Sequence, residues 1–107
     1  MSYCVVLVTA KDNKEAAKIA NGVLALKLAA CVNIVKGVDS LFWWQGKIDK
    51  IAETLLIIKT TKSCLQKLES AVKSLHSYST PEFIVLPILS GSKEYLAWIK
   101  KSVTVKK

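Results

Sequence analysis

One histidine and three cysteines carry most of the metal chemistry open to this 107-residue chain. Cys4, Cys31 and Cys64 are widely spaced, so there is no C-x-x-C pair for zinc binding or dithiol exchange. Copper and zinc sites usually take three or four ligands from thiolates, imidazoles and carboxylates. His76 and Cys31 are therefore predicted as metal ligands that need further ligands from other chains. The alternative for His76 is a histidine that caps a loop or lies at the surface, and Cys4 and Cys64 are expected to pack in the interior.

Enzymatic residue patterns are missing from the sequence. No Ser-His-Asp arrangement, glycine-rich phosphate loop or paired-carboxylate spacing is present. The chain contains no arginine, the residue that an acylphosphatase-type site would need to hold a phosphate. We therefore predict that the protein is not an enzyme.

The formal net charge of +8 comes entirely from lysines that are spread along the chain. Basic charge of this kind supports only non-specific nucleic-acid binding, so solvated surfaces are the preferred interpretation. No apolar run approaches the roughly 20 residues that span a bilayer. The first residues, MSYCVVLVTA, lack the basic region of a signal peptide. Together with an odd number of free thiols, this predicts a cytoplasmic protein that binds neither nucleic acid nor membrane.

A long β-hairpin is the main element available to position these side chains. Gly46 supplies the turn, since glycine readily adopts positive φ. The apolar, β-branched arms cover residues 31–45 and 47–60, with a bulge expected near Lys36 and Gly37. Strands usually have about five or six residues, and edges as long as these aggregate unless another chain pairs with them. The hairpin therefore predicts a tight homo-oligomer.

The other elements follow from apolar periodicity and capping residues. They form one predicted domain over residues 1–107 with an α+β fold. The order βαββαβ, followed by an additional C-terminal helix, is typical of a ferredoxin-like sandwich with two helices on one face of an antiparallel sheet. The expected elements are a strand over 3–9, a helix capped by Asp12 and Glu15 and running to Leu28, a helix opened by Ser63 and Gln66, a strand over 83–89 and a helix containing Tyr95 to Ile99.

Four segments in a fixed order carry a resemblance to a known family. They cover residues 29–34, 40–48, 55–60 and 76–82, and the last continues into 86–88 and 95–99. In these segments the chain resembles the CutA divalent-cation-tolerance family. The resemblance implies a ferredoxin-like fold, a tight trimer formed by strand pairing between subunits, and a link to tolerance of copper or other divalent cations.

The chain departs from the family pattern at several positions. The family usually has proline where this chain has Ser77, and often an acidic residue or glutamine at Ser79. Some bacterial members have a cysteine at the position of Val8 and a second histidine at Leu75, both implicated in copper binding. His76 alone remains of that set.

The resemblance also implies a cleft between neighbouring subunits and a trimer interface. One interpretation of the cleft is a site for an anion or small molecule; the other is an ion pair between Lys59 and Glu82 that Tyr78 closes. Residues assigned to the cleft are Asn33, Trp44, Lys59, Tyr78 and Glu82, with Cys31 beside them, and those assigned to the interface are Trp43, Trp44, Gly46 and Pro81.

Three functions therefore stay open from the sequence. The first is a metal-responsive trimer with copper or another divalent cation as its cofactor. The second is a regulatory or scaffold trimer, comparable to PII-like sensors, that binds a small anionic ligand or a partner protein in the cleft. The third is a trimer that only presents surfaces to another protein.

Overall fold

The predicted α+β class is confirmed by the computed structural model, which describes residues 2–103, so the ends of the predicted 1–107 domain lie outside it. The elements in chain order are β1 (Tyr3–Ala10), α1 (Asn13–Ala25), β2 (Cys31–Trp44), β3 (Lys47–Thr61), the short 3-10 helix η1 (Lys62–Cys64), α2 (Leu65–Leu75), β4 (Ile84–Pro87) and α3 (Lys93–Ser102).

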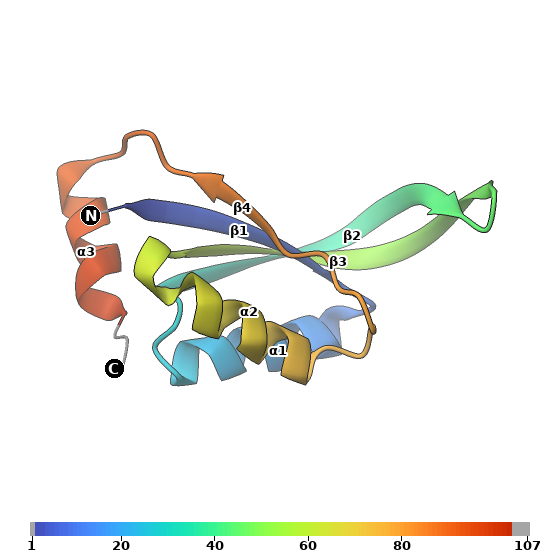
Figure 1. Cartoon of the computed structure of the whole chain (residues 1–107), viewed down its shortest axis with the longest axis horizontal. Coiled ribbons are helices and arrows are strands. Elements are labelled where there is room, and N and C mark those ends of the chain that lie inside the picture. Colours follow the sequence, from blue (N-terminus) through green and yellow to red (C-terminus); the bar gives the residue numbers. More distant parts are fainter. Residues whose placement is uncertain (1, 104–107) are drawn as a thin grey trace.

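The four strands form one antiparallel sheet in the order β2-β3-β1-β4. Helices α1 and α2 lie side by side on one face of this sheet, and α3 lies at the end opposite the hairpin tip (Figure 1). The β2–β3 hairpin projects well beyond both helices and gives the molecule its longest extent of 44 Å (Figure 1). None of the helices within residues 2–103 has the length and apolar content needed to cross a bilayer.

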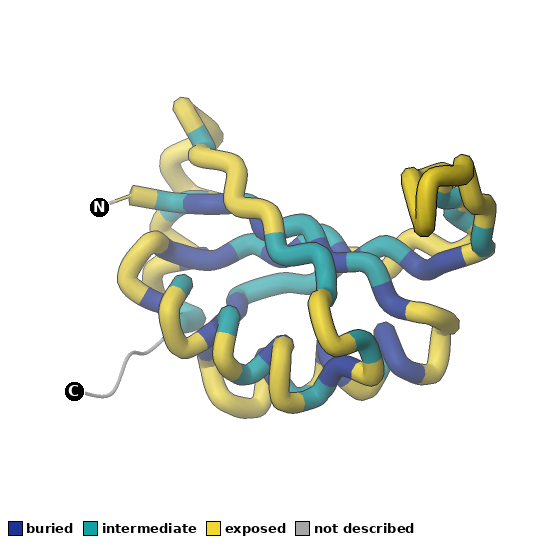
Figure 2. Tube along the Cα trace, turned by 45° about the vertical axis from the view of Figure 1, so that its right-hand side comes forward, coloured by how far each residue is buried: buried dark blue, intermediate teal, exposed yellow. Residues whose placement is uncertain are grey.

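The core lies between the sheet and the two helices. Side chains alternate along β1, so Val6 and Val8 are fully buried against the helices while Val5 and Leu7 are half-buried on the other face. The buried face is completed by apolar residues of β3, α1 and α2, which include Leu56, Ile58, Ile19 and Leu68. Helices α1 and α2 leave the opposite face of the sheet uncovered, and α3 contacts β3 at the end away from the hairpin tip (Figure 1). Figure 2 shows that the hairpin tip itself is exposed.

Helix α1 begins as predicted and ends earlier than predicted. The Asp12 side chain accepts a hydrogen bond of 2.8 Å from the backbone N–H of Glu15. The helix stops at Ala25 because Lys27 takes a left-handed conformation with φ of 58°. Such a residue ends a helix, and the periodic apolar residues up to Leu28 concealed this end.

Two further boundaries differ from the sequence predictions. Ser63 does not cap α2, since its hydroxyl lies 2.9 Å from the Thr61 hydroxyl and a 3-10 turn precedes the helix. Strand β4 is shorter than the predicted 83–89 strand. It is an edge strand with one neighbour, and just beyond its end the backbone N–H of Ile88 still donates a 2.9 Å hydrogen bond to the Tyr3 carbonyl.

The hairpin is as long as predicted, with arms of 14 and 15 residues. Gln45 and Gly46 form its turn with φ of 51° and 78°, a pair of positive values that a two-residue hairpin turn requires. The predicted bulge is confirmed by a register shift between Val35 and Val38, where Gly37 has φ of 70°. The hairpin therefore forms from local sequence signals.

Candidate functional site

A groove of about 880 Å³ lies where the hairpin leaves the sheet. One wall comes from both hairpin arms, and the other comes from the segment that links α2 to β4. Its lining residues are Thr9, Asp39, Ser40, Leu41, Phe42, Trp44, Asp49, Ile51, Glu53, Tyr78, Ser79, Thr80 and Glu82. Three of the predicted cleft residues, Trp44, Tyr78 and Glu82, therefore lie together within one chain.

Four carboxyl groups line the groove, from Asp39, Asp49, Glu53 and Glu82. Glu53 is the most deeply placed of them, with 8% of its surface exposed. The Tyr78 hydroxyl donates a 2.8 Å hydrogen bond to Oε2 of Glu53. Burial and this carboxylate raise the pKa of Tyr78 to about 12, so the hydroxyl stays a donor at neutral pH. Asp39, Asp49 and Glu53 were not predicted from the sequence, although acidic residues are unusual enough within strands to have indicated them.

Burial, and then the neighbouring Glu53 carboxylate, raise the pKa of Glu82 above its ordinary value of 4.5. The folded protein thus binds the carboxyl proton of Glu82 more tightly than the unfolded chain does. The free energy of unfolding therefore falls as the pH rises from 4.5 through the higher pKa of the folded state. We expect Glu82→Gln to raise the melting temperature at neutral pH and to have little effect well below pH 4.5. Scanning calorimetry between about pH 3 and 8 measures this difference.

Glu69→Gln is the matched control, since Glu69 is a half-exposed glutamate that pairs with Lys73 at 2.7 Å on α2. Its effect is expected to be small and not to grow with pH. An effect of Glu82→Gln that is the same at every pH would contradict the assignment of like-charge repulsion in the groove.

His76 lies next to the groove wall, and its side chain is fully buried. Its Nε2 lies 2.7 Å from the carbonyl oxygen of Thr9, and the backbone N–H of Tyr78 donates to its Nδ1 at 3.0 Å. A carbonyl oxygen can only accept, so Nε2 carries the proton and Nδ1 accepts. Both ring nitrogens are engaged, and a metal ion at His76 would have to displace one of these partners.

A glutamate from α1 faces the same imidazole. Oε1 of Glu15 lies 3.3 Å from Nδ1 of His76 and, within residues 2–103, is a buried oxygen without a hydrogen-bond donor. His76 therefore connects α1, β1 and the linker before β4, as in the loop-capping alternative.

Cys31 lies at the other end of the sheet, where it is half-buried. Nζ of Lys59 is 3.9 Å from its sulfur, and Lys59 is its cross-strand partner. Burial, and then the neighbouring Cys31 thiol, raise the pKa of Tyr95 in α3. Cys4 and Cys64 are buried, as predicted.

The structure separates the predicted sites within one chain. Asn33, Cys31 and Lys59 lie on the open face of the β2–β3 pair, outside the groove. In residues 2–103 no group of three or more histidine, cysteine, aspartate or glutamate side chains is placed to hold a metal ion. Whether a neighbouring chain brings Lys59 or Cys31 to the groove stays a prediction.

The predicted interface residues lie at or near the surface. Trp43 and Trp44 are 73% and 60% exposed, Gly46 is exposed in the turn, and Pro81 is half-buried beside the groove. Because neighbouring strand residues point to opposite faces, Trp43 and Trp44 present two different apolar surfaces. Their role in assembly stays a prediction.

Comparison with known proteins gives one consistent family. Residues 4–102 match the family described as "CutA1 divalent ion tolerance protein". A relative named "Protein CutA 1, chloroplastic" from Oryza sativa subsp. japonica is 50% identical over 92% of this chain, and the chain spans 56% of that relative. The "Divalent-cation tolerance protein CutA" of Thermus thermophilus is 44% identical over 92% of this chain and 95% of its own length.

Solved structures give the same result. The crystal structure of CutA1 from Oryza sativa superposes with a TM-score of 0.96 at 44% identity. That superposition covers 99% of this chain and 97% of the rice chain. The mixed α+β architecture with its four-stranded antiparallel sheet is thus shared with a protein of known structure.

Proposed function

This chain belongs to the CutA1 divalent ion tolerance family, and from that membership we propose that it acts in divalent-cation tolerance as a homotrimer that binds copper weakly. The observation that carries the proposal is the match over residues 4–102, which includes the whole hairpin. The chain covers only about half of the rice relative. The function of that longer protein is therefore assigned to this chain only as a proposal.

Apolar surfaces that one chain leaves uncovered support the proposed assembly. Large apolar side chains are exposed at the hairpin tip and on β4, among them Leu41, Trp43, Ile48, Ile84 and Leu86. Exposed apolar surface on this scale marks a protein interface. The strand order β2-β3-β1-β4 with two helices on one face is consistent with the ferredoxin-like sandwich that the trimeric family arrangement would use.

Copper, or another divalent cation, would bind at ligands that several chains contribute. Cys31 is the better placed of the two predicted ligands because its thiol is half-buried while His76 is fully engaged. A soft thiolate suits Cu(I). One chain alone does not supply the three or four ligands of a complete site.

Native mass spectrometry of the metal-free protein, titrated with copper, zinc and nickel, tests this proposal. We expect weak copper uptake that Cys31→Ala abolishes and His76→Gln leaves in place, since Cys31 offers its sulfur and His76 does not offer a free nitrogen. Cys4→Ala is the matched control, a buried cysteine on β1. Equal uptake by all three variants, or uptake of every metal alike, would contradict a specific copper site.

A second candidate function is a PII-like regulatory or scaffold trimer, and the groove at the hairpin base favours it. A groove of about 880 Å³ is of the size that holds small molecules. An anionic ligand, as predicted from Lys59 and Tyr78, would need Lys59 to enter from a neighbouring chain, since the groove of one chain is lined by carboxylates.

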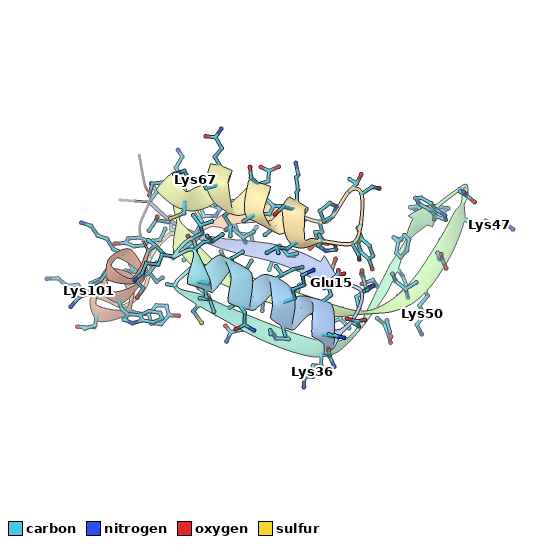
Figure 3. The ribbon with its side chains drawn as sticks, turned by 90° about the horizontal axis from the view of Figure 1, so that it is seen from below. Glu15, Lys36, Lys47, Lys50, Lys67 and Lys101 are labelled. Carbon is cyan, nitrogen blue, oxygen red and sulfur yellow. The ribbon has the colours of Figure 1, made fainter. Side chains whose placement is uncertain are left out.

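We propose a cytoplasmic protein without enzymatic activity that binds neither nucleic acid nor membrane. The distribution of the lysines supports the absence of a nucleic-acid or membrane surface. Those labelled in Figure 3 are spread over β2, the hairpin, α2 and α3 and are not gathered on one face.

A further inference from the structure

The groove is acidic although the chain is basic. The formal net charge is +8, yet four carboxyl groups and no lysine occur among the residues that line the groove. Lys50 reaches Asp39 at 3.9 Å from outside the groove, and both side chains are about two-thirds exposed. This is the one ion pair found at the groove within residues 2–103, so carboxyl groups outnumber ammonium groups there.

Glu53 shows most clearly that a positive charge is missing. Its carboxylate is more than nine-tenths buried and accepts a hydrogen bond from Tyr78, but no cation of the described residues pairs with it. Glu82 adds a second acidic group close enough to repel it. Buried carboxylates are normally paired with a cation, because removing a charge from water is costly.

The groove walls indicate what kind of cation would fit. Phe42, Trp44 and Tyr78 provide aromatic rings, and Leu41 and Ile51 provide apolar surface. Aromatic faces attract ammonium groups, and apolar walls accept an aliphatic chain. A bare metal ion would need at least three converging ligands, an arrangement that the histidine, cysteine and acidic side chains of residues 2–103 do not provide.

We propose that this groove is a binding site for a primary alkylammonium group, with the ammonium between Glu53 and Glu82 and the aliphatic chain along Trp44. The inference rests on the ligand groove of the second proposed function and assigns its ligand class. Two sources share this chemistry. One is a free linear diamine or polyamine, and the other is the side chain of a lysine from a second copy of the chain.

Lys59 is the lysine that best fits the second source. It is half-buried, whereas the other lysines that the structure describes are exposed. Its ammonium group contacts the Cys31 sulfur, and no carboxylate within residues 2–103 lies within ion-pair distance of it. Lys59 and Glu53 are six residues apart on β3, roughly 20 Å along a strand, so Lys59 cannot reach the groove of its own chain.

Isothermal titration calorimetry with 1,5-diaminopentane tests the site, with sodium glutarate at equal ionic strength as the anionic control. We expect the diamine to bind the wild-type protein or the Lys59→Ala variant and glutarate to bind neither. Glu53→Gln is introduced into the protein that binds the diamine, either the wild type or Lys59→Ala. It should weaken diamine binding at least about tenfold, because it removes the buried charge. Glu69→Gln, at a half-exposed glutamate of α2 outside the groove, should leave binding unchanged.

The same titration distinguishes the two sources. If the ligand is a free amine, the wild-type protein and Lys59→Ala bind the diamine with similar affinity. If Lys59 of a second copy fills the groove, the wild type does not bind, and Lys59→Ala binds and regains thermal stability with the diamine. Lys62→Ala, an exposed lysine of η1, should behave as the wild type does.

Two outcomes overturn the proposal. One is that neither the wild type nor Lys59→Ala binds the diamine, and the other is that Glu53→Gln binds it as well as its parent does. Sedimentation of the same samples reports the assembly independently. A trimer that fails to bind the diamine refutes the amine site without refuting the trimer, and copper uptake is measured separately from both.

Discussion

Replacing His76 with alanine is expected to destabilise the fold by about 3 kcal/mol, although the residue lies in a linker between secondary-structure elements. The substitution removes the hydrogen bonds to Thr9 O and from Tyr78 N. It also leaves the buried Glu15 carboxyl group facing an empty space. Denaturant unfolding at a fixed protomer concentration measures the loss, because assembly contributes to apparent stability.

Two conservative variants separate the contributions. His76→Gln keeps a side-chain donor toward Thr9 O, and His76→Asn keeps an acceptor for the Tyr78 N–H. Both should lose less stability than alanine does. Ser77→Ala is the control, since Ser77 is the exposed neighbouring residue. A loss below about 1 kcal/mol for His76→Ala would mean that the imidazole is not a structural connection.

The second large effect is expected on assembly. Trp43→Ala should weaken the association of chains by about 2–4 kcal/mol while each chain stays folded. Trp43 is 73% exposed at the hairpin tip and contributes little to the fold of its own chain, whereas buried tryptophans are common anchors of protein interfaces. Analytical ultracentrifugation over a dilution series gives the shift in the assembly midpoint.

Lys47→Ala is the matched control for this prediction. Lys47 is an exposed residue of the same hairpin tip and pairs with Trp44 across the turn, so its loss removes charge and leaves the apolar surface (Figure 3). We expect its assembly midpoint to stay near that of the wild type. An unchanged midpoint for Trp43→Ala as well would show that the hairpin tip lies outside the interface.

Most of the fold could be predicted from the sequence because its signals are local. The turn at Gly46, the bulge near Gly37 and the cap at Asp12 each depend on a few neighbouring residues, and the structure confirms all three. The end of α1 near Lys27 and the start of α2 near Ser63 were predicted wrongly. At both places the backbone conformation differs from what residue preference predicts. Boundaries depend on single hydrogen bonds and so are weakly encoded.

The candidate site was predicted less completely, because its residues come from distant parts of the chain. Trp44, Tyr78 and Glu82 do line one groove, but Glu53, its most buried acidic residue, carried no recognised motif. His76 was predicted as either a ligand or a loop cap, and the sequence could not distinguish the two. That distinction depends on Thr9, which lies 67 residues away and accepts its ring N–H.

By itself, the sequence determined the class of the fold, the long hairpin and the family, since periodicity, turn residues and ordered segments are properties of neighbouring residues. The tertiary structure alone decided which charges meet. Glu53 faces Tyr78 and Glu82 because the linker after α2 crosses the base of the hairpin, and Lys59 is kept apart from them by the length of β3. A strand fixes the spacing of its own side chains, whereas packing between elements determines which other side chains they reach.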